Sequence, residues 1–136
     1  MLFFASPSAL REHLDQISPP SRSLGFVPTM GALHDGHLEL VRRSVTENNH
    51  TVASIFVNPL QFNNPDDLQK YPRTIETDCA MLEEAGCDLV FAPSAEEMYT
   101  QPPVLQLGFG PLEHVMEGAY RPGHFNGVGI GVARLF

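Results

Sequence analysis

Two histidines with a glycine between them, in the run His34-Asp35-Gly36-His37, form the densest group of chemically active side chains in this sequence. An apolar stretch precedes them and a helical pattern follows, so they are expected at the entrance of a helix. Free backbone N–H groups there favour an anion, glycine lets a ligand approach the backbone, and imidazoles hydrogen-bond a developing phosphate charge. The segment therefore indicates contact with nucleotide phosphates. Two other interpretations stay open here: metal ligation by His34, Asp35 and His37, and ordinary loop residues.

A second polar cluster, Asn58-Pro59-Leu60-Gln61-Phe62, follows a run of β-branched residues. The amides of Asn58 and Gln61 each offer a donor and an acceptor, which suits neutral hydroxyl and amide groups better than acid–base chemistry. Phe56 and Phe62 beside them fit the apolar walls of a small-molecule site. The cluster is a candidate binding site, although polar loop residues of this kind are common.

A third glycine-containing loop, residues 117–127, carries Arg121 and His124 ahead of a helical pattern. It is a candidate for a second helix entrance that faces an anion. The glycines that follow do not make a dinucleotide-binding loop, because no strand precedes them. Glycine within a helix costs about 1 kcal/mol relative to alanine, so close packing or weak helicity is expected there.

The elements that must position these clusters alternate between strand and helix. Strands are predicted over residues 23–27, 51–57, 88–92 and, less regularly, 104–107. Helices are predicted over residues 7–17, 38–48, 74–86, 95–98, 112–117 and 125–135, and residues 58–73 form a long connection. The alternation predicts an α/β fold with a mostly parallel sheet flanked by helices, in which ligands bind at the carboxyl ends of the strands.

Composition narrows the function classes. The 136 residues fit one domain, and a net charge of −8 argues against a protein that coats nucleic acid. No apolar run approaches the roughly 20 residues of a membrane span, so a cytoplasmic protein without membrane contact is expected. Cys79 and Cys87 are expected as reduced, structural thiols. Most of the acidic residues between positions 58 and 100 are expected on solvated helix faces.

Four segments, in order along almost the whole chain, together resemble the pantothenate synthetases, or pantoate–β-alanine ligases. They are VPTMGALHDGH at 27–37, FVNPLQF at 56–62, YPRT at 71–74 and RPGHF at 121–125. The histidine pair is shared by the wider nucleotidylyltransferase superfamily, and the 56–62 segment is more specific. The resemblance implies a Rossmann-like domain over residues 1–136 and a ligase that joins (R)-pantoate to β-alanine. It also implies ATP and Mg²⁺, a pantoyl adenylate intermediate, release of pyrophosphate and AMP, and a homodimer.

The resemblance also implies roles for individual residues. The ATP site would consist of Met30, Gly31, Ala32, Leu33, His34, Asp35, Gly36 and His37. His34 and His37 would be catalytic at the phosphates, with His37 the family's proton donor, and no side chain is expected to ligate a metal. Gln61 would bind pantoate near β-alanine. Weaker assignments to the same site are Met30, Asn58, Tyr71, Arg121 and His124.

Members of the family are longer than this chain. The basic and hydroxyl phosphate contacts of the family, and its smaller C-terminal domain, are expected in sequence beyond residue 136. As an N-terminal part, the chain is expected to bind substrates weakly and to turn over slowly or not at all by itself. Two alternatives remain: a non-catalytic domain that binds a nucleotide or a partner, and another nucleotidylyltransferase that acts on a phosphorylated small molecule. The neutral amide cluster at 58–62 argues against the second.

Overall fold

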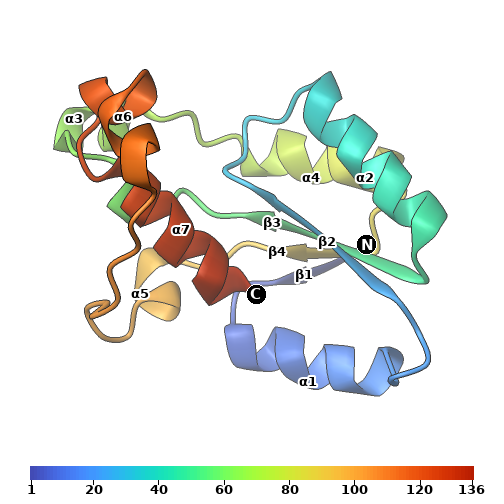
Figure 1. The fold of residues 1–136 in the computed structure, drawn as a ribbon. Coiled ribbons are helices and arrows are strands. Elements are labelled where there is room, and N and C mark those ends of the chain that lie inside the picture. The colour runs from blue at the N-terminus through green and yellow to red at the C-terminus, as the bar shows by residue number, and fades with distance from the viewer. The chain divides into compact units, whose positions relative to one another are not determined.

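The structure is a computed structural model that describes residues 1–136 and divides into two compact units (Figure 1). Unit 1 comprises residues 1–56 and 72–97, and unit 2 comprises residues 57–71 and 98–136. The single Rossmann-like domain over residues 1–136 stays a prediction. No helix is long and apolar enough to cross a lipid bilayer.

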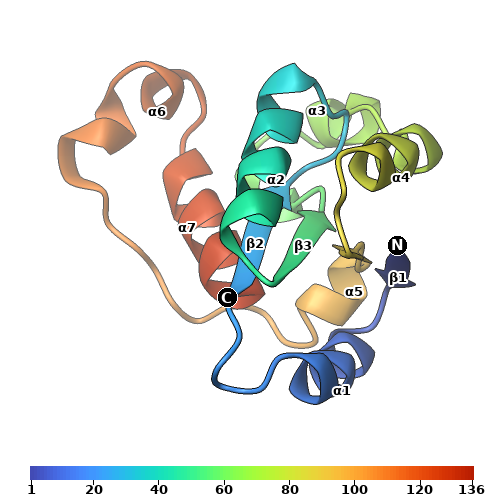
Figure 2. The same ribbon diagram turned by 90° about the vertical axis from the view of Figure 1, so that its right-hand side faces the viewer.

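Unit 1 is built on a four-stranded sheet in the order β1-β4-β3-β2. The strands are β1 (Leu2–Phe4), β2 (Leu24–Thr29), β3 (His50–Ile55) and β4 (Leu89–Phe91), and every neighbouring pair is parallel. Helix α1 (Pro7–Ile17) lies on one face, and α2 (Asp35–Glu47) and α4 (Ile75–Glu84) lie on the other (Figure 1). Figure 2 shows α2 over β2 and β3. The predicted α/β class with a mostly parallel sheet is confirmed.

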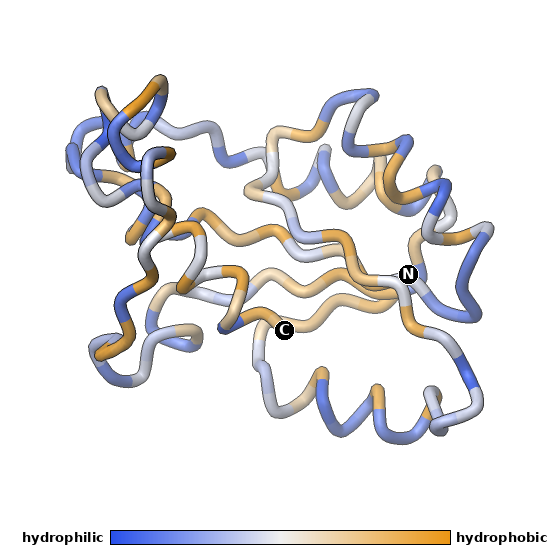
Figure 3. Tube along the Cα trace, in the orientation of Figure 1, coloured by the Kyte–Doolittle hydropathy of each residue, from blue (hydrophilic) through white to orange (hydrophobic).

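The core of unit 1 lies between the sheet and the pair α2 and α4. Val41 and Leu82, from the two helices, and Ala53 and Val90, from the two central strands, are fully buried. The central strands read as nearly continuous apolar runs because both of their faces are covered. In Figure 3 the strands are mostly orange, the colour of hydrophobic residues, whereas hydrophobic and hydrophilic residues alternate along α1. Cys79 and Cys87 are free thiols, as expected.

Unit 2 contains only short helices and one longer one. The elements are η1 (Pro59–Gln61), α3 (Pro65–Lys70), η2 (Gly110–His114), α6 (Glu117–Tyr120) and α7 (His124–Leu135). Helix α7 packs directly on η1. A Cβ atom at Gly127 would overlap the backbone carbonyl of Leu60, and one at Gly131 would overlap the side-chain amide nitrogen of Asn58. Of the two expectations for these glycines, close packing or weak helicity, the contacts at Gly127 and Gly131 confirm close packing.

Several sequence-based elements differ from the structure. The strand expected at 104–107 is wrong: no strand forms, and the Leu107 N–H donates to the side chain of Asn126 at 2.7 Å instead of to a neighbouring strand. The helix expected at 112–117 is replaced by η2 and α6, with Met116 between them at a positive φ of 48°. Backbone of that conformation cannot continue a right-handed helix.

Three elements were not predicted: β1, and η1 and α3 within the predicted connection at 58–73. Strand β1 is only three residues long and shows no periodicity, and it exists because Phe3 pairs in parallel register with Val90. Helix α3 lies within the predicted loop at 58–73. Its start carries a recognisable signal, since the Asn64 side chain accepts from the Asp66 N–H at 2.9 Å and Pro65 occupies the first turn.

Candidate functional site

The histidine pair lies where the parallel sheet ends. Thr29 and Ile55 are paired in register at the carboxyl ends of β2 and β3. The chain then turns through residues 30–34 and enters α2 at Asp35. Ligands of open α/β sheets bind at this edge, which makes the turn the first candidate site.

His34 and His37 cap the helix entrance together. The Nδ1 atom of His34 accepts a hydrogen bond from the Gly36 N–H at 3.1 Å, and the Nδ1 atom of His37 accepts one from the His34 N–H at 3.3 Å. The ring centroids lie 4.0 Å apart. Each ring therefore satisfies a backbone donor that the first turn of a helix would otherwise leave unpaired.

This arrangement fixes where the imidazole protons are. A ring nitrogen that accepts from a backbone N–H carries no proton of its own, so both neutral rings hold their proton on Nε2. Burial is the main cause that lowers the pKa of His37 from its usual 6.5, the neighbouring His34 lowers it further, and Asp78 partly offsets both. In their neutral forms the two rings thus present two Nε2–H donors.

The backbone amides of the turn are less available than the sequence suggested. The N–H of Gly31 donates to the Thr29 hydroxyl at 3.2 Å, and the amides of Ala32 and Leu33 donate to Asp78. The His37 N–H donates to the His34 carbonyl at 2.9 Å. These four amides are not free for an anion, because side chains and a helix-entrance bond within unit 1 already hold them. The Nε2–H groups of the two imidazoles are not used by the hydrogen bonds described above.

Asp78 is the residue of this region that sequence reasoning missed. Its carboxylate is 1% exposed and accepts from the amides of Ala32 at 3.0 Å and Leu33 at 2.9 Å. The hydroxyl of Thr74 donates to it at 3.1 Å. The sequence did hold a signal, since Asp78 lies four residues before the buried Leu82 and therefore shares its helix face. Ile75, at the start of the same helix, is 39% exposed.

In unit 2, Asn58 has its hydrogen bonds inside the protein. The side chain is 4% exposed, and its Nδ2 donates to the Gly127 carbonyl at 2.9 Å. Its Oδ1 accepts from the Leu60 N–H at 3.1 Å and from the Tyr99 hydroxyl at 2.9 Å. Asn58 thus joins η1 to α7, and its contact with a ligand stays a prediction.

Gln61 is held by its backbone and has an unused side-chain acceptor. Its carbonyl accepts from Arg121 Nη2 at 3.3 Å and from His124 Nδ1 at 3.0 Å. A carbonyl only accepts, so His124 carries its proton on Nδ1. The side-chain Oε1 of Gln61 is buried and has no hydrogen-bond partner within the chain. Buried polar atoms are rarely left without a hydrogen-bond partner. The Oε1 atom of Gln61 is therefore a candidate ligand contact.

Aromatic packing adds Tyr71 to the same part of unit 2. The Arg121 guanidinium lies 5.7 Å from the centre of the Phe62 ring, and Phe62 meets Tyr71 edge to face at 5.7 Å. Arg121, His124 and Tyr71 thus support the segment around Gln61. Whether they touch a ligand themselves stays a prediction.

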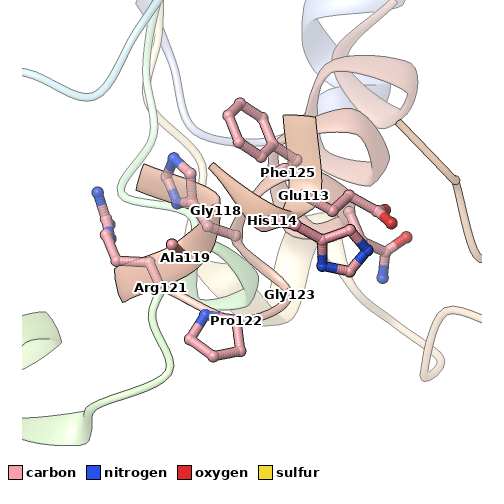
Figure 4. A pocket seen from close by; sticks show the side chains of 10 residues that line it. Glu113, His114, Gly118, Ala119, Arg121, Pro122, Gly123 and Phe125 are labelled. Carbon is pink, nitrogen blue, oxygen red and sulfur yellow. The ribbon is translucent and has the colours of Figure 1, made fainter. Parts of the chain in front are cut away.

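A hollow of about 560 Å³ lies within unit 2, between η2, α6 and the start of α7 (Figure 4). Arg121 and His124 line it together with Glu113 and His114, whereas Gln61 and Asn58 do not. Its volume suits a small molecule. Arg121 and His124 also bond the Gln61 carbonyl, so this hollow shares two of its polar residues with the segment around Gln61.

The two units divide the predicted site residues between them. Unit 1 brings together Met30, Gly31, Ala32, Leu33, His34, Asp35, Gly36 and His37. Unit 2 brings together Asn58, Gln61, Tyr71, Arg121 and His124. No three His, Cys, Asp or Glu side chains lie close enough to hold a metal ion, so the metal interpretation of His34, Asp35 and His37 has no geometric support.

Comparison with known proteins gives one consistent family. A family model described as pantoate-beta-alanine ligase matches residues 3–136. Pantothenate synthetase from Bacteroides thetaiotaomicron is 55% identical over 127 residues, which cover 93% of this chain and 45% of that protein. The enzyme from Cytophaga hutchinsonii is 50% identical over 136 residues, covering 100% of this chain and 48% of that protein.

Solved structures agree. The crystal structure of pantothenate synthetase from Thermus thermophilus matches with a TM-score of 0.87 and 50% identity, over 100% of this chain and 48% of that one. Pantoate-beta-alanine ligase from Francisella tularensis, complexed with beta-gamma ATP and beta-alanine, matches with a TM-score of 0.93 and 36% identity, over 99% of this chain and 52% of that one. The chain spans about half the length of these relatives.

Proposed function

The chain belongs to the pantoate–β-alanine ligase family, and from that premise we propose that the protein containing it condenses pantoate with β-alanine at the expense of ATP. In the first step a pantoate carboxylate oxygen attacks the α-phosphorus of ATP, and the bond to pyrophosphate breaks. In the second step the β-alanine amine attacks the acyl carbon of pantoyl adenylate, AMP leaves with the bridging oxygen, and the amine loses a proton to solvent. Neither step requires a covalent bond to the protein.

One observation carries the proposal: two imidazoles at the carboxyl edge of a parallel sheet present Nε2–H donors while their Nδ1 atoms are occupied. Transfer of the adenylyl group spreads negative charge over phosphate oxygens. Donors that are oriented beforehand stabilise such charge without reorganising during the reaction. We assign His34 and His37 to this role, His37 as the family's proton donor, and residues 30–37 to the ATP site.

Gln61 supports pantoate as the other ligand at the adenylation step. Its buried Oε1 lacks a partner, and a hydroxyl is the kind of donor that such an oxygen needs. Pantoate carries hydroxyl groups, whereas a phosphorylated small molecule would bring negative charge to a neutral acceptor. We therefore place pantoate at Gln61 in unit 2, and we propose Asn58, Tyr71, Arg121 and His124 of the same unit as further residues of the pantoate and β-alanine site. Met30 of unit 1 is proposed as a pantoate contact by the family resemblance alone.

ATP and β-alanine are the ligands named for the Francisella tularensis relative, and we propose them as substrates here. We further propose that ATP enters as its Mg²⁺ complex. The side chains do not form a cage of acidic ligands. That fits Mg²⁺, which commonly arrives on substrate phosphates and retains several of its waters.

We also propose a homodimer in the cytoplasm. Several large apolar side chains of unit 2 are strongly exposed, among them Val104 at 98%, Tyr120 at 85% and Met116 at 82%. Surfaces of this kind usually contact another protein surface. Consumption of ATP and two free thiols fit a reducing compartment. Light scattering of the purified protein tests the dimer.

The deciding experiment measures AMP and pantoyl adenylate from ATP, pantoate, β-alanine and Mg²⁺, using the complete gene product that contains residues 1–136. His37→Ala is expected to lower the single-turnover rate of adenylate formation by about 100-fold, the usual effect of removing one donor to a developing charge. Pantoate affinity should change little, because its proposed acceptor is Gln61.

The matched control is His13→Ala. His13 is also a partly buried histidine, but it lies on α1, where it packs against Phe4 at 5.2 Å. It should leave the adenylation rate within about twofold. Saturable ATP binding without any adenylate from the wild-type protein would instead support the non-catalytic alternative. Transfer of AMP to a phosphorylated acceptor, with pantoate inert, would support another nucleotidylyltransferase.

A further inference from the structure

The turn before α2 adopts a backbone conformation that needs outside support. Gly31 and Ala32 are consecutive residues at positive φ, 79° and 50°. Alanine rarely adopts this conformation, because its Cβ then approaches a carbonyl oxygen. A Cβ at Gly31 would lie only 3.0 Å from Asp78 Oδ2 and 3.1 Å from the Ile55 side chain. The turn therefore lies tightly between the end of β3 and the carboxylate of α4.

Asp78 supplies that support. Its Oδ1 accepts from the Leu33 N–H, and its Oδ2 accepts from the Ala32 N–H and the Thr74 hydroxyl. All three bonds are between 2.9 and 3.1 Å, and the carboxylate is 1% exposed. A buried charge is costly unless it is hydrogen-bonded, and here two of its three partners are backbone amides of the turn.

The supported turn leads directly into the imidazole cap. Leu33, which donates to Asp78, is followed by His34, whose N–H orients the His37 ring and whose own ring accepts from Gly36. A shift of the turn would move the His34 N–H and with it the His37 ring. The position of both Nε2–H donors thus depends on the carboxylate.

We propose that Asp78 is a positioning residue for adenylation, which holds the turn at residues 31–33 so that His34 and His37 aim their Nε2–H groups at the phosphate. This inference rests on the proposed function for its kinetic part alone. Asp78 touches no substrate in this account and acts through the two histidines.

The test variant is Asp78→Asn in the complete gene product. An asparagine side chain keeps the volume but offers one acceptor oxygen, so its NH2 group must face one of the donors that the carboxylate now accepts. The single-turnover rate of adenylate formation should fall by at least about tenfold, since small misplacements of catalytic groups are costly. The dissociation constant of pantoate should stay within about twofold.

A second readout does not depend on activity. Long-range ¹H–¹⁵N spectra report the tautomer and environment of each imidazole, and the signals of His34 and His37 should shift in Asp78→Asn. Thr74→Val removes one donor to the carboxylate and should produce a smaller effect in both readouts, whereas Thr74→Ser keeps the hydroxyl and should restore the wild-type result. If Asp78→Asn does not fold, Thr74→Val and Thr74→Ser test the inference: equal rates and imidazole signals in these two variants would overturn it.

Asp88→Asn is the matched control, because the Asp88 carboxylate also accepts a backbone N–H, that of Thr51 at 2.7 Å, but at the amino end of β3. It should change neither the adenylation rate nor the two imidazole signals. A folded Asp78→Asn protein with wild-type imidazole signals and rate would overturn the inference. A wild-type protein that forms no pantoyl adenylate would refute the proposed function, while the imidazole signals would still test the role of Asp78.

Discussion

The turn between β2 and α2 and the segment around η1 both follow the carboxyl end of a parallel strand, but they leave opposite hydrogen-bonding groups unused. In the turn, the imidazoles of His34 and His37 accept from backbone amides, so only N–H donors remain. Around η1, the Asn58 side chain is held by three hydrogen bonds, and the buried atom without a partner is the Oε1 acceptor of Gln61.

This difference separates two kinds of recognition. Unused donors fit an anion such as a phosphate, and an unused neutral acceptor fits a hydroxyl. Composition alone does not reveal it, because histidine and glutamine each carry both donor and acceptor capacity. In the histidine turn, bonds from backbone N–H groups select the donor capacity, whereas at Gln61 burial of Oε1 marks the acceptor.

The largest expected effect is on the free energy of unfolding, for a substitution that displaces η1 and leaves the histidine turn unchanged. In Gly127→Ala the new Cβ would collide with the Leu60 backbone carbonyl, which cannot move aside without displacing η1. We expect a loss of about 3 kcal/mol in unfolding free energy, at the upper end for overpacked positions. Urea denaturation measures it. Pantoate affinity should fall, while the imidazole signals of His34 and His37 should keep their wild-type positions.

The control for this variant is Gly129→Ala in the same helix. There the Cβ would meet the side-chain ends of Leu107 and Phe109, which can shift. Gly129→Ala should therefore cost clearly less than Gly127→Ala. Equal losses would show that α7 does not pack on η1 as described.

A smaller effect is expected on the KM for pantoate when the unpartnered Oε1 acceptor of Gln61 is removed. Gln61→Met keeps a side chain of similar length without the buried oxygen, so stability should be unchanged or slightly raised. The KM for pantoate should rise about tenfold, which corresponds to one lost hydrogen bond. Steady-state kinetics and a melting curve are read together, since only a ligand contact lets affinity fall while stability holds. A fall in stability would identify Gln61 as a structural residue.

The smallest expected effect is on the pH dependence of folding stability, and it concerns only His37 in the histidine turn. Because the pKa of His37 is lowered from 6.5, chiefly by burial, the unfolded chain binds more protons than the folded one in the window just below 6.5. Stability should therefore decline as pH falls from about 6.5 through the lower folded pKa. Urea titrations between pH 8 and 5 should show a shallower decline for His37→Ala than for the wild type. The same pH dependence of stability in both proteins would contradict a lowered pKa of His37.

The sequence allowed the histidine turn and the alternation of strand and helix to be predicted, because both depend on local signals. Glycine and histidine spacing marks the turn, and the β-branched run at 51–57 marks a strand covered on both faces. Strand β1 could not be predicted in the same way, since three residues carry no period and its existence depends on pairing with β4.

Side-chain partners account for most of the remaining misses. Asp78 was grouped with solvated acidic residues because nothing local distinguishes it, and only the approach of the Ala32 and Leu33 amides makes it a buried ligand of the turn. Val104 and its neighbours carry an apolar pattern, but no adjacent strand exists to pair with them. The free acceptor of Gln61 likewise depends on which polar groups surround it.

The most direct test observes the two imidazoles themselves, in long-range ¹H–¹⁵N spectra of the complete gene product at neutral pH with and without Mg²⁺ and ATP. The account predicts that the neutral forms of His34 and His37 both carry the proton on Nε2, and that both Nε2 signals move when the nucleotide binds. A proton on Nδ1 in either ring, or Nε2 signals that stay in place at saturating nucleotide, would contradict it.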